Sequence, residues 1–471
     1  MSLRESAENI VRTLREAGFE AYFVGGCVRD MVLGVDPHDY DVATSALPHQ
    51  VRELFDRVIE VGAQFGVCRV RVGGNWSEVA TFRSDLGYSD GRRPDAVAFT
   101  DARGDVLRRD FTINGLFYEP LADQIIDHVG GQADIKAKLV RCIGDPAERF
   151  AEDKLRLLRA VRFAARLDYE IEAETLAAIR QMADQVTAVS AERIGAELLN
   201  LFTGAHADRG LQLLEDTGLL VQVLPEVHAM IGVRQPERFH PEGDVFEHTR
   251  LMLAGMEAPS PELALGVLLH DVGKPPTFEE ADRIRFNRHD RAGAEIAGEI
   301  CRRLRLPNSV ADTVVALVRS HMTFMNVRTM RESRLKRLLR EPWFEDALEL
   351  HRLDCLASHG DLSTWAFCRE RLAALEPEQV RPPRLLTGHD LIEMGYTPGP
   401  QFKQILDALE DAQLEDRIQG REQAVEFVRR EFPGAENTAC PPQPARRSGN
   451  EGGEKRRREG AEPNPARDEH R

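Results

Sequence analysis

Two aspartates one residue apart, Asp39 and Asp41, are the first residues whose types and spacing suggest chemistry. They stand in the stretch HDYDVATS, which is typical of a β-strand. Side chains two residues apart share one face of a strand, so both carboxylates would lie side by side at the edge of a sheet. Two close like charges are costly unless a cation lies between them. Mg²⁺ binds carboxylates together with substrate phosphates, so the pair predicts a site for two magnesium ions.

The residues before this pair suit phosphate binding. Gly25 and Gly26 open a short predicted helix, VRDMVLG, whose first amide groups can hold phosphate oxygens, and Arg29 follows one turn later. Taken alone, Asp39 and Asp41 could be solvated loop residues and the two glycines a simple turn. The combination of Gly-Gly, Arg-Asp, a short helix and Asp-x-Asp is more demanding and favours a phosphate and metal site.

A second candidate site lies further along, in ERFAEDKLRLLRAVRFAARL. Asp153 and Arg156 are three residues apart and would be neighbours on one helix face. A carboxylate only accepts hydrogen bonds and a guanidinium only donates them, so the pair complements the pairing edges of cytosine and adenine and mismatches those of uracil and guanine. Arg159 and Arg162 continue this face and would meet the base or the triphosphate. A solvated helix face with ion pairs is the alternative explanation.

Together these motifs resemble the nucleotidyltransferase superfamily, and most closely the bacterial class II CCA tRNA nucleotidyltransferases and their poly(A) polymerase relatives. The block RRDFTIN strengthens the resemblance, which places Arg109 and Asp110 near the sugar and phosphates of the incoming nucleotide. Asp110 would also cap a helix over FTINGLF. The resemblance further implies that Asp153 and Arg156 read the base and that DLGYSDGRRPD is a flexible loop. Glu78, on a predicted strand, is either a third metal-site carboxylate or an exposed strand residue.

Another family block, SAERIGAEL, contains Arg193 and Glu197, which we expect to brace the helices rather than touch substrate. Later, the apolar run in LALGVLLHDVGKP predicts a buried helix that delivers an adjacent His and Asp to a pocket. This region resembles the HD phosphohydrolase domain. The resemblance implies the metal ligands His248, His270, Asp271 and Asp354. Imidazole and carboxylate groups suit Mn, Ni, Zn or Mg. Lys274 would meet a phosphate, and His289 is either a ligand or an exposed loop residue.

The whole chain predicts an α+β protein of several domains, because 471 residues exceed one hydrophobic core. Strand and helix patterns alternate at first, and helices follow. We expect a polymerase-β-like nucleotidyltransferase palm, with a mixed sheet and helices, then an all-α neck, an HD domain and C-terminal helices. The expected limits are 1–145 for the head, 146–235 for the neck, 236–365 for the HD domain, 366–432 for the C-terminal helices and 433–471 for a disordered tail.

Charge and composition restrict the partners. A net charge of −16 argues against a simple nucleic-acid coat, so RNA would be held by local basic surfaces or through metal ions. The stretch NVRTMRESRLKRLLREPWF is one such surface, or else a solvated helix. No run approaches the roughly 18 apolar residues of a membrane helix, and no signal peptide is recognisable. Seven scattered cysteines without a CxxC pair suit the cytoplasm.

The resemblance implies a template-independent enzyme that adds C and A from CTP and ATP to the 3′ end of tRNA and releases pyrophosphate. Asp39 and Asp41 would hold two Mg²⁺ ions, and Gly26, Arg29 and Arg109 would bind the triphosphate. A poly(A) polymerase, or a specialised A-adding or CC-adding enzyme, would use the same head. The alternatives from other classes are a metal-dependent HD phosphohydrolase with a degenerate head and a non-catalytic RNA-binding protein. The sequence does not indicate an oligomeric state.

Overall fold

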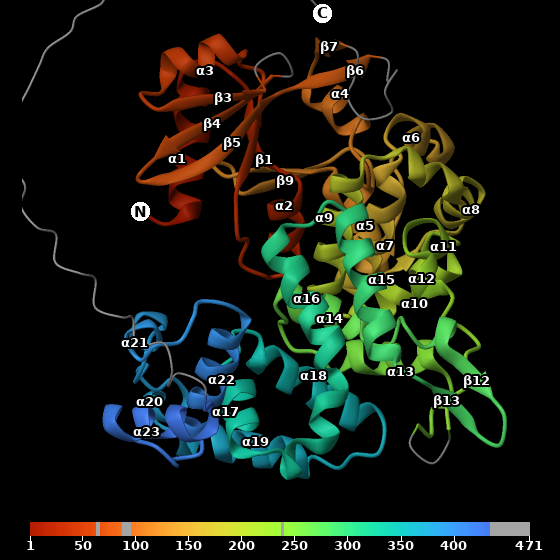
Figure 1. Ribbon diagram of the computed structural model, residues 1–471. Coiled ribbons are helices and arrows are strands. Elements are labelled where there is room, and N and C mark those ends of the chain that lie inside the picture. Colours follow the sequence, from red (N-terminus) through yellow and green to blue (C-terminus); the bar gives the residue numbers. More distant parts are fainter. Residues whose placement is uncertain (63–65, 87–95, 237–239, 434–471) are drawn as a thin grey trace, which may run out of the picture. The chain divides into compact units, whose positions relative to one another are not determined.

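The computed structural model describes residues 1–62, 66–86, 96–236 and 240–433 (Figure 1). The chain divides into two compact units, Met1–Arg381 and Pro382–Arg471. The loop predicted at DLGYSDGRRPD and the tail predicted from residue 433 lie almost entirely outside the described residues. None of the described helices is long and apolar enough to cross a membrane.

A seven-stranded mixed sheet forms the framework of the N-terminal part (Figure 1). Its strand order is β3-β4-β5-β2-β1-β8-β9, with β2 and β5 parallel and the other neighbours antiparallel. The strands are β1 (Ala21–Val24), β2 (Asp41–Thr44), β3 (Val58–Gly62), β4 (Val67–Val72), β5 (Asn75–Thr81), β8 (Leu116–Glu119) and β9 (Gln124–Asp127), and β6 (Arg83–Leu86) and β7 (Ala96–Phe99) form a separate hairpin. The helices are α1 (Leu3–Glu16), α2 (Gly26–Val32), α3 (Pro48–Leu54), α4 (Ala102–Leu107), the short 3₁₀ helix η2 (Thr112–Asn114) and α5 (Gly131–Ala137).

Local signals account for much of this part. Helix α1 starts at a capping box in which Ser2 and Glu5 bond each other's backbone amides. It buries Ile10 and Leu14 against the sheet. The helix expected over FTINGLF is wrong: a single turn, η2, leads into strand β8, which pairs with β1. All four residues of β8 are buried, and burying both faces of this strand outweighs the helix-like start.

Helices dominate from residue 146 onward. They are α6 (Pro146–Glu152), α7 (Leu155–Leu167), α8 (Ala173–Met182), η3 (Ala183–Ala188), α9 (Ala191–Phe202), α10 (Ala207–Asp216), α11 (Leu220–Val223) and α12 (Pro225–His228). The next group comprises α13 (Val245–Ala254), α14 (Pro261–Leu269), η4 (Pro275–Thr277), α15 (His289–Arg303), α16 (Asn308–Ser320), η5 (His321–Thr329), α17 (Glu332–Leu339), α18 (Phe344–Ala357), α19 (Ser363–Ala374) and α20 (Pro377–Val380). Two short strand pairs accompany them, β10 (Leu139–Val140) with β11 (Glu170–Ile171) and β12 (Phe278–Glu280) with β13 (Ile284–Phe286).

The second unit contains α21 (Gly388–Glu393), α22 (Pro400–Leu414) and α23 (Arg421–Glu431). It has its own hydrophobic core, which includes Leu391, Ile405 and Phe427. The α+β class, with a mixed sheet in the head and helices after it, is confirmed. The limits set for the individual domains remain predictions.

Candidate nucleotide and metal sites

The nine residues predicted for nucleotidyl transfer line a single cavity of about 540 Å³. They are Gly26, Arg29, Asp39, Asp41, Arg109, Asp153, Arg156, Arg159 and Arg162. Six further polar residues of the wall were not predicted from the sequence to contact substrate: Asp30, His38, Arg108, Asn114, Arg166 and Arg193. The head supplies the carboxylates Asp39 and Asp41, and α7 supplies four of the arginines, so the cavity lies between the sheet and the first neck helices.

Asp39 and Asp41 form the acidic part of this cavity. Strand β2 begins only at Asp41, and Asp39 lies in the irregular segment before it. Val42 pairs with Val79 in the parallel ladder, so Glu78 on β5 lies beside Asp41. Burial, together with the charges of Asp39 and Glu78, raises the pKa of Asp41 to about 7. Glu78 is exposed and does not line the cavity, although its charge acts on Asp41.

The Gly-Gly segment packs closely against the arginines of the cavity. Gly25 adopts a positive φ of 75°, which a glycine accommodates without strain, and a side chain there would approach the Arg109 guanidinium. Arg29, on α2, is buried. Its guanidinium donates one hydrogen bond of 2.8 Å to the Asn114 side-chain oxygen and one of 2.7 Å to the Asp30 carboxylate. The guanidinium of Arg29 is therefore fixed in place rather than free to swing.

Asp105 holds the two arginines of the RRDFTIN block. One carboxylate oxygen, Oδ1, accepts from Arg108, and the other, Oδ2, accepts from Arg109 at 2.8 Å. Asp105 is buried. Its burial would raise its pKa, but the Arg109 and Arg108 charges outweigh this effect and the pKa is lowered. Asp105 was missed in the sequence, although its spacing of three and four residues from the two arginines, which follow the end of α4, was a usable signal.

The expected uninterrupted neck helix is wrong. Helix α6 ends at Glu152, Asp153 has an extended conformation, and α7 starts at Leu155. The Asp153 carboxylate accepts from the Leu155 backbone amide at 3.1 Å, a bond that competes with a continuous helix. Asp153 and Arg156 are therefore not neighbours on one helix face.

The partners of these two residues differ as well. Arg156 donates to Glu152 at 2.8 Å and to the main-chain carbonyls of Arg149 and Arg108, both at 2.9 Å. Asp153 instead accepts two hydrogen bonds from Arg193 on α9. Both side chains still line the cavity, although Asp153 lies between two helices and Arg156 lies on α7.

Arg159 and Arg162 extend this network along α7. Arg159 donates to Asp110 at 2.6 and 2.9 Å, and Arg162 donates to Glu197 at 2.6 Å. Burial would raise the pKa of Asp110, but the Arg159 charge and hydrogen bonds lower it. The ring of Phe163 lies beneath three guanidiniums, those of Arg162, Arg159 and Arg29, at 4.2, 5.3 and 5.5 Å from its centroid.

The residues of the HD motif also converge. His270 and Asp271 follow α14, His248 lies on α13 and Asp354 lies on α18. His270 Nε2 lies 3.0 Å from Asp271 Oδ2, and His248 Nε2 lies 3.2 Å from Asp354 Oδ1. The three buried side chains His248, His270 and Asp271 place their ligand atoms within 4.8 Å of one another. This spacing could hold a metal ion.

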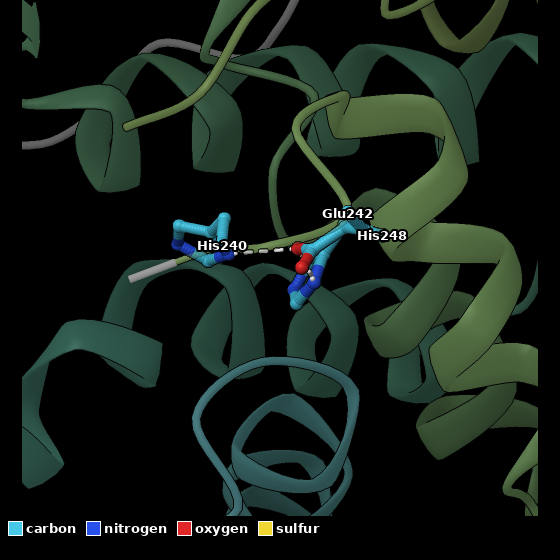
Figure 2. A group of neighbouring side chains, drawn as sticks. All are labelled: His240, Glu242 and His248. Carbon is cyan, nitrogen blue, oxygen red and sulfur yellow. Dashed lines mark hydrogen bonds and ion pairs between the residues drawn. The ribbon is translucent and has the colours of Figure 1, made fainter. Parts of the chain in front are cut away.

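Figure 2 shows the Glu242 carboxylate beside His248. Glu242 Oε1 lies 2.6 Å from His248 Nδ1 and 2.9 Å from His240 Nδ1. Because Glu242 occupies Nδ1, the Nε2 atom of His248 is the one directed at Asp354. Glu242 and His240 were missed in the sequence, where neither belongs to the HD motif.

A cavity of about 360 Å³ adjoins the HD cluster. Lys274 lines it, but its ammonium group is buried and pairs with Asp271 Oδ2 at 2.6 Å. His289 is buried and lines the same cavity, so it is not an exposed loop residue. The turn after Asp271 packs very tightly: a Cβ atom at Gly273 would lie 2.1 Å from the His289 carbonyl oxygen and 2.5 Å from the Gly293 nitrogen.

On the basic stretch NVRTMRESRLKRLLREPWF, the side chains of Arg328, Arg331 and Arg334 are exposed. Arg328 also donates to the Ser363 carbonyl oxygen at 2.5 Å. An RNA-binding role for this segment remains a prediction.

Three domain families match the chain. The Poly A polymerase head domain matches residues 21–141, the probable RNA and SrmB-binding site of polymerase A matches 168–231, and the HD domain matches 245–358. The fold and the matches thus define a chain with a head of the poly(A) polymerase type, a helical neck that matches the probable RNA and SrmB-binding site, and an HD domain.

Among proteins of this class, the chain is similar in sequence to CCA-adding enzymes. The CCA-adding enzyme of Levilactobacillus brevis is 45% identical over 216 residues, which is 46% of this chain and 54% of the relative. The CCA-adding enzyme of Oceanobacillus iheyensis is 47% identical over 214 residues, 45% of this chain and 53% of the relative. The chain spans about half the length of the curated relatives it matches.

Solved structures match over a longer range. The Bacillus stearothermophilus CCA-adding enzyme in complex with CTP aligns with a TM-score of 0.72 and 28% identity, covering 92% of this chain and 98% of that one. The Thermotoga maritima CCA-adding enzyme complexed with tRNA shares the fold, with a TM-score of 0.55 and 18% identity over 90% of this chain and 94% of that one. These matches confirm the resemblance to bacterial CCA-adding enzymes, with an HD domain present as well.

Proposed function

We propose that the chain is a template-independent tRNA nucleotidyltransferase that adds C and A from CTP and ATP to the 3′ end of tRNA. The observation that supports this most is the convergence of the nine predicted residues on one cavity. The names of the relatives, CCA-adding enzymes, point the same way. The cytoplasm, where tRNA and both nucleotides are available, is the proposed place of action.

In the proposed reaction, the 3′-hydroxyl of the RNA loses its proton to solvent and its oxygen bonds to the α-phosphorus of the nucleotide. The bond from that phosphorus to the bridging oxygen breaks, and pyrophosphate leaves. Asp39 and Asp41 would hold two magnesium ions. The raised pKa of Asp41 supports this, because it reflects a buried carboxylate beside two other acidic groups, an arrangement that a cation relieves. When bound, such ions supply positive charge for the charge that develops on the phosphates. Arg29 and Arg109 would bind the triphosphate.

Asp153 and Arg156 would read the base. A carboxylate has about four lone-pair sites, so Asp153 can accept from a base amino group while it is held by Arg193. Arg156 uses three of its five N–H groups in hydrogen bonds with Glu152 and two carbonyls, and the remaining two form no hydrogen bond with the described residues. The pair thus still offers the acceptor and donor that cytosine and adenine require.

The test supplies one nucleotide at a time to tRNA that lacks its last one, two or three residues. We expect incorporation of C with CTP alone on tRNA lacking CCA, of A on tRNA ending in CC, and a stop after the complete CCA. Repeated incorporation of A would identify a poly(A) polymerase, and incorporation of only C or only A would identify a specialised enzyme. Binding of tRNA without any incorporation would instead support a non-catalytic RNA-binding protein.

A second activity, metal-dependent hydrolysis of phosphate esters, is supported by the convergence of His248, His270, Asp271 and Asp354. We propose it as an addition to nucleotidyl transfer rather than a replacement, since the head retains Asp39 and Asp41 in its cavity. Asp271→Asn should abolish hydrolysis and leave nucleotide addition intact. Loss of both activities, with the fold intact, would argue against two separate sites.

A further inference from the structure

One arginine of the nucleotide cavity, Arg166, differs from the others in its contacts. Eight arginines line the cavity, and seven of them donate to a carboxylate. The pairs are Arg29 with Asp30, Arg108 and Arg109 with Asp105, Arg156 with Glu152, Arg159 with Asp110, Arg162 with Glu197, and Arg193 with Asp153. The side chain of Arg166 is exposed and forms no hydrogen bond or ion pair with the residues that the structure describes. Its guanidinium is therefore available to a ligand.

Arg166 lies on the cavity side of α7. It follows Arg159 by seven residues and Phe163 by three, spacings that place all three side chains on one face of the helix. With a rise of 1.5 Å per residue, Arg166 lies about 15 Å along the helix axis from Arg156, which we propose reads the base. The guanidinium of Arg29, which we propose binds the triphosphate, lies 5.5 Å from the centroid of the Phe163 ring. Arg166 therefore lies one turn beyond the level of Arg29, on the side away from the base.

We propose that Arg166 binds the terminal phosphate of the incoming nucleotide. A nucleotide whose base meets Arg156 and whose inner phosphates meet Arg29 extends its last phosphate towards Arg166. A guanidinium can form paired hydrogen bonds with phosphate oxygens, and Arg166 has all five of its N–H groups available. The inference rests on the proposed nucleotidyl transfer. It adds a residue with which the cavity distinguishes a triphosphate from a diphosphate.

The charges of the cavity wall favour this location. Six carboxylates offset the seven paired arginines, so that part of the wall carries little net charge. Arg166 adds a positive charge that no carboxylate of the described residues offsets, and the terminal phosphate is the most negative part of a triphosphate. In the proposed reaction this phosphate leaves as the outer half of pyrophosphate. The same contact would therefore also hold the product.

The alternative is a purely structural role for Arg166. It lies in the last turn of α7, where a positive charge stabilises the carbonyl end of a helix. Arg302 lies in the last turn of α15, is also exposed, and likewise makes no side-chain hydrogen bond or ion pair within the described parts of the chain. Arg302 is not among the residues that line the nucleotide cavity. Arg302→Gln is therefore the matched control for a loss of helix stabilisation.

The experiment compares the binding of a triphosphate with that of a diphosphate. Calorimetric titration measures the Kd of CTP and of CDP, with magnesium and without tRNA, for the full-length wild type, Arg166→Gln, Arg166→Lys and Arg302→Gln. We expect Arg166→Gln to weaken CTP binding roughly tenfold and to leave CDP binding unchanged, because CDP lacks the phosphate that Arg166 would meet. Arg166→Lys should lose less, since it keeps the charge. Arg302→Gln should bind both nucleotides as the wild type does, and its unfolding temperature should match that of Arg166→Gln.

Equal weakening of CTP and CDP, or no change in either, would overturn the proposal. A wild type that binds neither nucleotide would contradict the proposed nucleotidyl transfer itself, whereas an unchanged CTP to CDP ratio in Arg166→Gln would contradict only the role of Arg166.

Steady-state kinetics provide a second measurement. Arg166→Gln should raise the KM for CTP and for ATP by similar factors, because both nucleotides end in the same phosphate, and it should weaken inhibition by pyrophosphate. The KM for tRNA should stay unchanged. A raised KM for tRNA with normal CTP binding would show that Arg166 contacts an RNA phosphate instead, and would overturn the proposal.

Discussion

Arg193 donates to both oxygens of the Asp153 carboxylate, with Nη1 3.1 Å from Oδ1 and Nη2 2.7 Å from Oδ2. A two-point contact of this kind fixes the plane of the carboxylate as well as its position. Asp153 lies between two helices: its backbone amide caps α6, and its Oδ1 atom also accepts from the Leu155 amide. Arg193, forty positions later on α9, is the residue that contacts both oxygens and so sets the plane in which Asp153 presents its acceptors.

Arg193→Lys should weaken the choice of base. A lysine makes one point contact, so the carboxylate can rotate and the distinction between CTP and UTP should fall roughly tenfold or more. The measurement is the ratio of kcat/KM for the two nucleotides. Arg209→Lys, on α10 and paired with Glu170, is the matched control and should leave the ratio unchanged. An unchanged ratio in Arg193→Lys would show that Asp153 is oriented in some other way.

Asp41→Asn should lower nucleotide addition by more than about 100-fold, because it removes a carboxylate proposed to hold both ions. Glu78→Gln changes only a neighbouring charge and should retain most of the activity. Incorporation of labelled CMP measures both, and hydrolysis at the HD site serves as an internal control. Near-normal incorporation by Asp41→Asn would overturn the metal assignment.

The head should bind magnesium more tightly as the pH rises towards about 7. Burial and the charges of Asp39 and Glu78 raise the pKa of Asp41 to about 7, so below that pH a proton competes with the cation. Without metal, the folded chain holds this proton while the unfolded chain releases it near pH 4. The stability that this group contributes is present at low pH and is lost as the pH rises through about 7.

Melting temperatures in chelator across this pH range measure that effect. Asp41→Asn does not titrate, so its stability should fall less than that of the wild type between about pH 5 and about pH 8. Parallel curves for the two proteins would mean that Asp41 is ionised throughout.

Glu242→Gln should weaken metal binding at the HD motif by roughly 10- to 100-fold. The amide cannot hold His248 through a charged contact, so Nε2 loses its fixed direction (Figure 2). Glu247→Gln is the control, because Glu247 lies on the same helix and pairs with Arg250 instead. Cobalt titration measures the affinity, and equal affinities in the two variants would exclude an orienting role for Glu242.

Phe163→Ala should destabilise the fold by about 3 kcal/mol and also raise the KM for CTP. The ring is buried and supports three guanidiniums of the cavity. Phe202→Ala removes an equally buried ring that does not line the nucleotide cavity and should cost similar stability with an unchanged KM. A normal KM in Phe163→Ala would show that the arginines do not need this support.

The sequence was most informative where a motif is short and local. Asp39 with Asp41, and His270 with Asp271, could be found from their neighbouring motifs, because residues one or two positions apart stay close in the fold even though β2 begins only at Asp41. The break at Asp153 could not be predicted, because the segments of α6 and α7 both have sequences typical of helices. The break accompanies a single hydrogen bond between the Leu155 amide and the Asp153 side chain. Contacts between segments that are distant in the sequence could not be predicted either. The contact between His289 and His321, whose Nε2 atoms lie 3.1 Å apart, depends on how α15 packs against α16, and nothing near either histidine encodes it.

The HD region is sensitive to substitution at Gly273, although this residue has no polar side chain. The main chain at this glycine touches the His289 carbonyl and Gly293, so even a methyl group would force α15 away from the end of α14. His289 would then move relative to Asp271 while every histidine and aspartate remained in the sequence. A relative can therefore lose this chemistry through one small apolar substitution, and a search that checks only the His and Asp residues would still count it as active.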